Sequence, residues 1–336
     1  MHLHTTRDPL PQRLRGGVLA LGSFDGFHLG HQNVVGFAAQ LADQMQTSLG
    51  VFVTEPHPRM VFRPETEPFL LTPLATKARL MQNFGVDHMC ALPFNRQIAS
   101  MPAQDFVLDI LIKQLGAIHL VFGYDYRFGK GRGGGADMLA WMGHYEGFGT
   151  SQLEPIGVGV EGNAGEIYSS TLVRQAIREG LVRRAASLLG HWWSIEGQVQ
   201  MGDQRGRLIG FPTANMDIEE YIKPRFGVYA VRVRLPETGE TFVGVANVGK
   251  RPTFEKDDIK LEVHLFDFDR DIYEQTLQVD FVSFIRGEQK FDGIDSLKAQ
   301  IATDCDTAKL ALANPDNAAD RFPTPNRDDY SNPSQQ

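Results

Sequence analysis

The first half of the chain alternates between short apolar runs and segments in which apolar residues recur with helical spacing. The apolar runs, which predict buried strands, are residues 18–22, 49–53, 88–92 and 117–123. The helical segments between them are residues 34–45, 76–84 and 102–114. Strands and helices that alternate in this way form a parallel sheet with helices on both faces, so we expect an α/β domain. The first helix is expected to bury one face, made of Val34, Val35, Phe37, Ala38, Leu41 and Met45.

A different pattern begins after Gly190. Helices are predicted at residues 170–180 and 181–190, and from there to about Ile285 short strands are separated by Gly and Pro. The predicted strands are residues 192–199, 227–235, 241–248, 260–268 and 276–285. Many short strands without intervening helices are typical of a small antiparallel β-barrel. A final helix is predicted at residues 296–313.

These patterns divide the chain into three parts. We expect the α/β domain at residues 1–187 and the barrel with its terminal helix at residues 188–313. Residues 314–336 are rich in Pro, Asn and Asp and contain few apolar anchors, so we expect a disordered tail. Because a closed barrel has no open edges, a fragment from about residue 189 is expected to fold alone.

Composition and charge narrow the classes of function. Apolar residues make up 42% of the 336, enough for two cores, and the net charge is −8. An acidic chain does not attract nucleic acid or anionic membranes, so nucleotide chemistry here needs local positive sites or a metal ion. Two cysteines make no disulfide framework, and we find neither a signal peptide nor an apolar run of about 18 residues. We therefore expect a cytoplasmic protein that does not bind membranes.

The decapeptide GSFDGFHLGH joins the first predicted strand to the first helix. It places His28 and His31 where the free N–H groups and the dipole of a helix favour phosphate. The glycines allow a ligand to approach the backbone, and two imidazoles can donate hydrogen bonds to phosphate oxygens during adenylyl transfer. A plain pair of surface histidines is the alternative. A zinc site would need a third ligand, and neither a nearby cysteine pair nor an HExxH pattern supplies one.

This decapeptide resembles the His-x-Gly-His signature of a nucleotidyltransferase superfamily, and its FDG variant resembles the bacterial bifunctional riboflavin kinase/FAD synthetases. The resemblance continues through TEPHPRMVF (54–62), VFGYDYRFGKGRGG (121–134) and YSSTLVR (168–174). It implies a Rossmann-like nucleotidyltransferase domain that joins FMN to the AMP of ATP and releases pyrophosphate. The implied catalytic residues are His28, His31 and Arg174. The residues implied to bind ATP and phosphate are Gly22, Phe24, Asp25, Gly30, Ser170 and Thr171.

The YSSTLVR segment places the hydroxyls of Ser170 and Thr171 at a helix start, with Arg174 about one turn later. Hydroxyls, free N–H groups and a guanidinium together suit nucleotide phosphates. Taken alone, Ser-Thr at such a position is more often a plain helix cap.

The loop GYDYRFGKGRGG contains the residues that the resemblance assigns to flavin binding, Asp125, Arg127 and Phe128. Its glycines also fit a GxGxxG string, but a dinucleotide turn belongs after the first strand and this loop follows a late one. It is not a Walker A loop either, because Gly131 follows Lys130 in place of Ser or Thr.

A second glycine-rich segment, GDQRGRLIGFPTAN, spans residues 202–215. Gly202, Gly206 and Gly210 let backbone N–H groups approach phosphates, and Thr213 and Asn215 carry oxygens of the kind that Mg²⁺ accepts. An ordinary barrel loop is the alternative. The segment resembles the riboflavin kinase module, whose PTxN turn binds Mg²⁺ and ATP phosphate. The likeness continues through residues 226–233, 244–254 and 261–273.

Strict alternation in KLEVHLFDF turns Leu261 and Val263 towards the core and puts Glu262 and His264 on the other face. A glutamate on such a face is usually only solvated. The resemblance implies that Glu262 is the general base that takes the proton of the ribityl 5′-hydroxyl, a role worth about 10²–10⁴-fold in rate. His264 and Asp267 are the alternatives for this role.

Together the motifs predict an enzyme that phosphorylates riboflavin to FMN and adenylylates FMN to FAD, with ATP as co-substrate and Mg²⁺ as cofactor. Its partners are then small molecules, without nucleic acid or membrane. One alternative is that only one activity is retained. Another is a flavin- or RNA-binding regulator, but an RNA-binding barrel needs a basic face, and residues 262–271 carry four acidic side chains.

Overall fold

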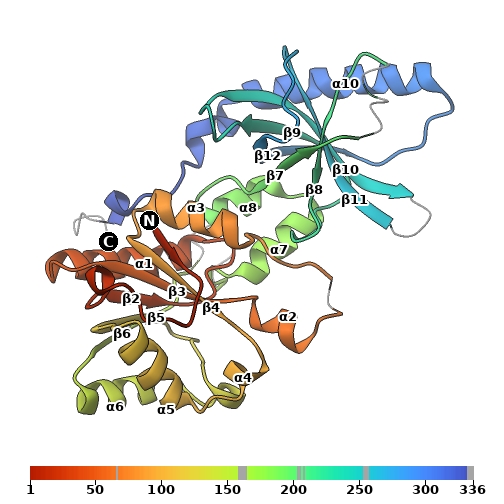
Figure 1. Cartoon of the computed structure of the whole chain (residues 1–336). Coiled ribbons are helices and arrows are strands. Elements are labelled where there is room, and N and C mark those ends of the chain that lie inside the picture. Colours follow the sequence, from red (N-terminus) through yellow and green to blue (C-terminus); the bar gives the residue numbers. More distant parts are fainter. Residues whose placement is uncertain (66, 158–164, 203–205, 207–208, 253–256, 331–336) are drawn as a thin grey trace. The chain divides into compact units, whose positions relative to one another are not determined.

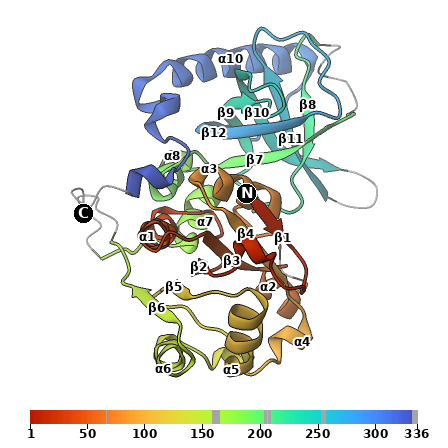
Figure 2. The ribbon, with the colours of Figure 1, turned by 60° about the vertical axis from the view of Figure 1, so that its left-hand side comes forward.

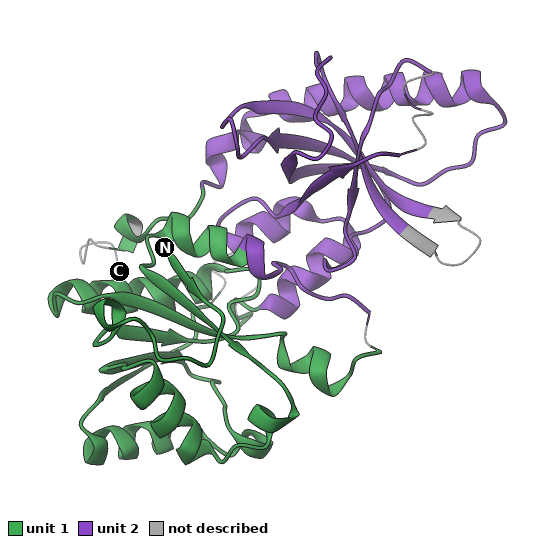
Figure 3. Cartoon of the chain, in the orientation of Figure 1, with its two compact units in different colours: residues 1–66, 77–169, 324–336 green, residues 67–76, 170–323 purple. Residues whose placement is uncertain are grey.

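The computed structural model describes residues 1–65, 67–157, 165–202, 206, 209–252 and 257–330 (Figure 1). Within the glycine-rich segment, residues 203–205 and 207–208 lie outside the described residues, as do residues 253–254 of the kinase-like stretch. The chain divides into two compact units (Figure 3). The first unit is residues 1–66, 77–169 and 324–336, and the second is residues 67–76 and 170–323.

A six-stranded parallel sheet forms the first unit, in the order β1-β4-β3-β2-β5-β6. The strands are β1 (His2–His4), β2 (Val18–Leu21), β3 (Leu49–Glu55), β4 (His88–Pro93), β5 (His119–Gly123) and β6 (Gly149–Leu153). The four central strands confirm the prediction from the apolar runs. The two edge strands, β1 and β6, lack such runs because each has only one neighbour.

Helices cover both faces of this sheet (Figures 1 and 2). The helical elements between residues 1 and 149 are α1 (Leu29–Gln44), α2 (Pro58–Phe62), α3 (Leu74–Phe84), α4 (Arg96–Ala99), α5 (Ala103–Asp105), the π-helix η2 (Phe106–Gln114) and α6 (Ala136–Glu146), with 3₁₀ turns η1 (Gln12–Leu14) and η3 (Lys130–Arg132). α1 packs on β2, β3 and β5, whereas η2 and α6 contribute to the core on the other face. The predicted α/β architecture is confirmed.

The buried face of α1 differs in part from the expected one. Phe37 is 38% exposed and Met45 is 41% exposed, whereas Gly36, Ala39 and Ala42 are buried. The prediction was wrong at Phe37 and Met45 because small residues, which a hydropathy pattern underrates, allow α1 to lie close to its neighbours.

A closed antiparallel barrel forms most of the second unit, in the order β10-β11-β8-β7-β12-β9. The strands are β7 (Ser194–Gln200), β8 (Ala214–Asp217), β9 (Gly227–Arg234), β10 (Thr241–Pro252), β11 (Asp257–Leu265) and β12 (Thr276–Gly287). The helix α10 (Ile294–Ala313) packs on β9, β10 and β12. The predicted barrel and terminal helix are confirmed. The four-residue strand β8 was missed because it directly follows the proline turn.

The second unit also contains α7 (Ser170–Glu179), α8 (Val182–Leu189) and residues 67–76, so its boundary differs from the expected one at residue 187. Trp193 donates its indole N–H to the Leu71 carbonyl at 3.1 Å, and the hydroxyls of Tyr221 and Thr76 lie 2.6 Å apart. These contacts arise from a segment more than 100 positions earlier in the chain, which strand patterns do not reveal.

The structure also corrects the expectation of a disordered tail at residues 314–336 as far as residue 330, and residues 331–336 lie outside the described residues. Residues 314–330 form three 3₁₀ turns, η4 (Pro315–Asn317), η5 (Ala319–Arg321) and η6 (Arg327–Tyr330). In the second unit, Asn317 donates its amide to the Ala311 carbonyl at 2.9 Å, and the ring of Phe322 lies edge-on to Trp192 at 5.0 Å. The few anchors of this polar segment each have a specific partner, which composition alone does not indicate.

Candidate functional site

The turn between β2 and α1 is backbone-strained and held by buried aromatic rings. Phe24 and Phe27 have positive φ angles of 48° and 45°, a conformation that costs about 1–3 kcal/mol per residue unless its surroundings hold it. Both rings are almost fully buried, and Phe27 packs edge-on against Phe84 at 5.2 Å. A Cβ at Gly22 would lie 2.9 Å from the Phe24 ring, so this glycine makes room for the turn itself. Phe24 and Gly22 therefore shape the backbone at the start of α1.

His28 and His31 lie together at the N-terminus of the 16-residue helix α1. His28 is the N-cap, and its Nδ1 accepts the His31 backbone N–H at 3.3 Å. The two rings stack with centroids 3.6 Å apart, and Phe24 lies edge-on to His31 at 5.2 Å. A neutral imidazole that accepts at Nδ1 carries its proton on Nε2, so His28 is a hydrogen-bond donor there. The predicted histidine pair is thus brought together beside the helix N–H groups.

Three further residues complete this turn. Asp25 is fully buried, and a Cβ at Gly30 would lie 3.2 Å from the His28 ring. Lys77, only 3% exposed, donates its Nζ to the Ser23 carbonyl at 2.8 Å. Sequence reasoning missed Lys77, although a single lysine within an otherwise apolar helix face was a usable signal. Lys77 therefore brings a buried amino group to the backbone of this turn.

Ser170, Thr171 and Arg174 lie in the first turns of α7, in the second compact unit. Arg174 donates its Nε to the Phe69 carbonyl at 2.9 Å, and its guanidinium lies 5.3 Å from the centre of the Phe69 ring. Phe69 therefore fixes the orientation of this arginine. Within their unit these three residues are placed as the sequence predicts, at one helix start.

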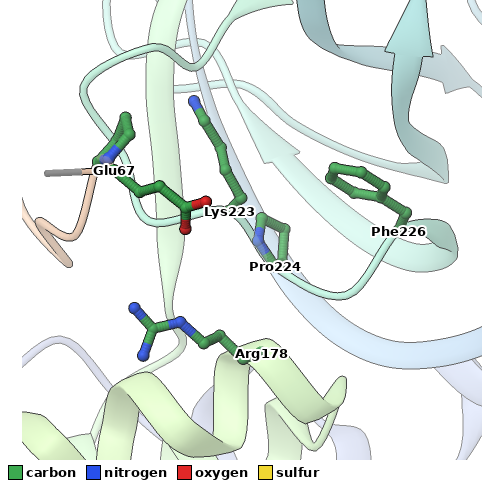
Figure 4. A pocket seen from close by; sticks show the side chains of 6 residues that line it. Glu67, Arg178, Lys223, Pro224 and Phe226 are labelled. Atoms are coloured by element: carbon green, nitrogen blue, oxygen red, sulfur yellow. The ribbon is translucent and has the colours of Figure 1, made fainter. Parts of the chain in front are cut away.

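A cavity of about 250 Å³ lies further along α7 and contains none of the predicted site residues (Figure 4). Arg178 of α7 and Lys223 line it from two sides, and Glu67 supplies one carboxylate. Pro68, Pro224 and Phe226 form its apolar walls.

The loop between β5 and α6 contains a second cavity, of about 420 Å³. Arg127 lines it together with Arg132 and Gln152, whereas Asp125 is exposed nearby and is not among its lining residues. Phe128 is 6% exposed and packs in the core against Phe106, with ring centroids 5.6 Å apart. Of the three residues assigned to flavin, the structure places Arg127 in a cavity and Phe128 beneath the loop. The ring of Phe128 thus anchors the loop and presents no open face.

In the barrel, three polar side chains lie in one row across neighbouring strands. Glu262 of β11 is directly opposite Asn215 of β8 on one side and Asn247 of β10 on the other. Directly opposed residues share a face of the sheet with Cβ atoms about 4.5–5.5 Å apart. Asn247 was missed from sequence, although its place in the alternating run VANV puts it on the same face as Glu262. The register therefore joins the PTxN turn to the predicted base.

Several contacts fix the PTxN turn beside this row. His264 donates its Nδ1 to the Pro212 carbonyl at 2.8 Å, and Phe211 donates its N–H to the Gly206 carbonyl at 2.8 Å. A Cβ at Gly206 would lie 2.4 Å from the Phe211 oxygen, so only glycine fits there. Gly210 has a φ of +91°, which also favours glycine. The glycines therefore serve the geometry of the turn. His264 has the role of tying this turn to β11.

The Asn215 side chain has the features of a cation ligand. It is 7% exposed, and its Oδ1 is buried without a hydrogen-bond partner among the described residues. Its Nδ2 donates to the Thr213 carbonyl at 3.3 Å, so the oxygen is the end of the amide that remains without a partner among the described residues. A Cβ at Gly202 would lie within 2.5–2.8 Å of this amide, so Gly202 makes room for it. A buried amide oxygen in need of a partner fits a hard cation such as Mg²⁺.

Comparison with known proteins identifies the family of this chain. A family model for FAD synthetase matches residues 10–170, and one for riboflavin kinase matches residues 189–312. A bifunctional riboflavin kinase/FMN adenylyltransferase of Escherichia coli K12 is 40% identical over 294 residues, covering 88% of this chain and 92% of its own. The chain belongs to the bifunctional riboflavin kinase/FMN adenylyltransferase family. A relative from Bacillus subtilis 168 with the same name is 37% identical over 313 residues, covering 88% and 93% of the two chains.

A solved structure also has the fold of this family. A crystal structure described as a macrolide-efflux protein from Streptococcus pneumoniae is similar with a TM-score of 0.79 and 31% identity, covering 92% of this chain and 99% of that one. Within the described residues, we find no helix that combines the length and apolar character needed to cross a membrane.

Proposed function

We propose that this chain phosphorylates riboflavin to FMN in its second unit and joins FMN to the AMP of ATP in its first unit, making FAD. One observation carries the proposal. The row of Asn215, Glu262 and Asn247 belongs to one compact unit and the stacked pair of His28 and His31 to the other, which supports one reaction in each unit. Membership of the bifunctional family supports the same assignment.

In the kinase reaction, Glu262 takes the proton of the ribityl 5′-hydroxyl as that oxygen attacks the γ-phosphorus and ADP leaves. The half-buried carboxylate lies on the strand directly opposite Asn247 and Asn215, and we propose that Asn247 orients it. Positioned proton transfer contributes about 10²–10⁴-fold, and the remainder comes from alignment and charge neutralisation. Thr213 and the Oδ1 of Asn215 would hold Mg²⁺, which when bound supplies positive charge to the ATP phosphates.

In the adenylyl transfer, an oxygen of the FMN phosphate attacks the α-phosphorus of ATP, and the bond to the β-phosphate breaks to release pyrophosphate. The N–H groups of the first turn of α1 and the Nε2–H of His28 donate to the phosphate oxygens. His31, stacked on His28, acts with it. Lys77 adds positive charge behind the turn. We propose that Arg127 contacts FMN. Arg174, Ser170 and Thr171, which we also propose bind nucleotide phosphate, lie at the start of α7 in the second unit.

The proposed substrates are small molecules, and we place the enzyme in the cytoplasm. The described part of the chain contains two free cysteines, Cys90 and Cys305, both buried. Free thiols of this kind are typical of a reducing compartment.

The test is steady-state kinetics of both half-reactions, followed by chromatography of FMN and FAD. Glu262→Gln keeps the shape of the side chain and removes the basic oxygen, so kcat for FMN formation falls by about 10²–10⁴-fold. FAD formation from supplied FMN stays unchanged. The matched control is Glu237→Gln, the same chemical change at an exposed turn of the same unit. Near wild-type kinase turnover in Glu262→Gln would remove Glu262 from the role of base.

The complementary variant, His28→Ala/His31→Ala, abolishes FAD formation and leaves riboflavin phosphorylation intact. Thr213→Ala raises the KM for ATP in the kinase reaction as well as lowering kcat. A protein that bound flavin without any turnover would instead support the regulator alternative.

A further inference from the structure

Residues 324–330 of the C-terminal tail pack on α1, in the same compact unit as the histidine turn (Figure 3). Both family-model matches end before this segment, the later one at residue 312. Neither match therefore accounts for the contacts that it makes.

Two glycines of the first unit leave space for side chains of this segment. Gly36 lies in the middle of α1, where glycine is less favourable than alanine. A Cβ there would lie 2.5 Å from Cγ of Tyr330, so the glycine leaves space for this ring. Gly85 has a φ of +93°, and its built Cβ would lie 2.5 Å from Cδ of Arg327. Because two side chains of the tail each pack against a glycine, the tail has one defined position on the first unit.

Polar contacts hold the segment in that register. Arg327 pairs with Asp43 at the end of α1 and donates its Nη1 to the Gly85 carbonyl at 3.3 Å. Gln40 donates its side-chain amide to the Tyr330 carbonyl. The contacts thus come from both ends of the docked turn η6.

A series of hydrogen bonds and a series of ring contacts each connect Tyr330 to Phe27 in the histidine turn. Its hydroxyl donates to Oε1 of Gln32 at 3.2 Å, and Nε2 of Gln32 donates to the Phe27 carbonyl at 2.7 Å. Its ring lies 5.6 Å from that of Phe84, which packs on the Phe27 ring at 5.2 Å. Phe27 has a positive φ and directly precedes His28. Both the backbone and the ring of this strained residue are therefore supported by Tyr330.

We propose that Tyr330 is a positioning residue for FMN adenylylation, and that the docked tail holds Phe27 and hence His28 in the productive geometry. This inference rests on the proposed role of His28 and His31. A loss of positioning lowers kcat while the enzyme still binds its substrates, because displacement of a catalytic group affects the transition state most.

The experiment compares full-length substitution variants with truncated chains, each assayed for both half-reactions. Tyr330→Phe removes one hydrogen bond and lowers kcat of adenylylation by about 2- to 10-fold, with KM for FMN and ATP unchanged. A chain ending at Pro323 loses both series of contacts and shows a larger fall. Riboflavin phosphorylation is the internal control and stays constant, and a chain that ends at Tyr330 is the matched deletion control.

Gly36→Ala distinguishes positioning from general loosening. Alanine favours the helical conformation of α1 but occupies the space of the Tyr330 ring. The kcat of adenylylation is therefore expected to fall as in the deletion. Gly36→Ala combined with the deletion falls no further than either change alone, because both act through the same contact. Independent, multiplying losses would overturn the proposal.

Amide hydrogen exchange of residues 29–40 measures docking separately from activity. Faster exchange in the deletion, together with lower kcat, supports the proposal. Unchanged exchange means that the tail is not docked, and faster exchange with unchanged kcat means that it does not position the turn. Either result overturns the inference. Retained activity in His28→Ala/His31→Ala would instead overturn the proposed site, while the exchange data still report on docking.

Discussion

Removal of the Asp304 carboxylate would test how α10 is held on the barrel. Asp304 of α10 is 4% exposed at its side chain, and Arg286 of β12 is 20% exposed. Arg286 donates Nε to Oδ1 at 2.9 Å and Nη2 to Oδ2 at 2.7 Å. This bidentate arrangement fixes the guanidinium and the carboxylate relative to each other. Gln300 donates a further hydrogen bond to Oδ1 at 2.9 Å. The pair joins the terminal helix to the sheet at a point with little access for water.

The expected loss of stability is large because the charge of Arg286 remains without its partner. Removing one partner of a buried ion pair typically costs about 3–5 kcal/mol, since the remaining ion is desolvated without compensation. For a domain of this size, each kcal/mol shifts the melting temperature by about 2–4 °C. Asp304→Ala is therefore expected to lower the melting temperature of the second unit by about 6–20 °C.

The assay is thermal unfolding combined with the residual activity of each half-reaction after heating. Kinase activity of Asp304→Ala is lost at a lower temperature than in the wild type, whereas adenylylation is lost where it was before. Asp109→Ala is the matched control, because its partner Lys113 is 71% exposed and such a pair is worth only about 0–1 kcal/mol. Replacing both partners, as Arg286→Met/Asp304→Leu, recovers much of the loss. A cost below about 1 kcal/mol for Asp304→Ala would refute this reasoning.

Further expectations concern the boundary of the barrel and the buried titratable groups. A fragment that begins at Leu189 lacks residues 67–76, so urea unfolds it earlier than the barrel of the full chain, and a peptide of residues 67–76 added in trans restores stability. Burial lowers the pKa of His88 from 6.5 to about 4, so below pH 6.5 only the unfolded chain takes up this proton. The free energy of unfolding of the first unit therefore decreases by about 3 kcal/mol as the pH falls towards 4. Urea unfolding at pH 7 and 4.5 is expected to show a smaller decrease for His88→Leu than for the wild type. Burial raises the pKa of the Cys90 thiol to about 12, so a thiol reagent at pH 8 does not label Cys90 until the protein unfolds.

Sequence patterns predicted those elements that are buried on both sides or that alternate strictly. The central strands of the parallel sheet are continuous apolar runs, and β11 is an alternating one, so both were read correctly. Edge strands such as β6 and the short strand β8 carry neither signal. Their positions are set by pairing with neighbours, which a local pattern does not contain.

The candidate site shows the same division. The motif predicted His28 beside His31 at the start of a helix, as the structure has them. Motifs further along the chain named Glu262 and Asn215 in separate segments, and the register of β8 and β11 brings them opposite each other. Motifs did not reveal Lys77, since it reaches the turn from another helix. Nor did the motifs reveal the neighbours of the glycines: a Cβ at Gly22 or Gly202 would meet Phe24 or Asn215, which is known only from the fold.

The membership of residues 67–76 in the second unit affects the order of events during synthesis. This segment presents Phe69, Leu70 and Leu71, all at most 6% exposed in the folded chain. Leu71 leaves the ribosome 122 residues before Trp193, whose indole covers it. At a translation rate of about 5–20 residues per second, the three apolar side chains remain without their barrel contacts for roughly 6–25 s. During that interval the nascent chain exposes these apolar side chains to solvent. We therefore expect this enzyme to depend on chaperones early in translation, before any of the barrel exists.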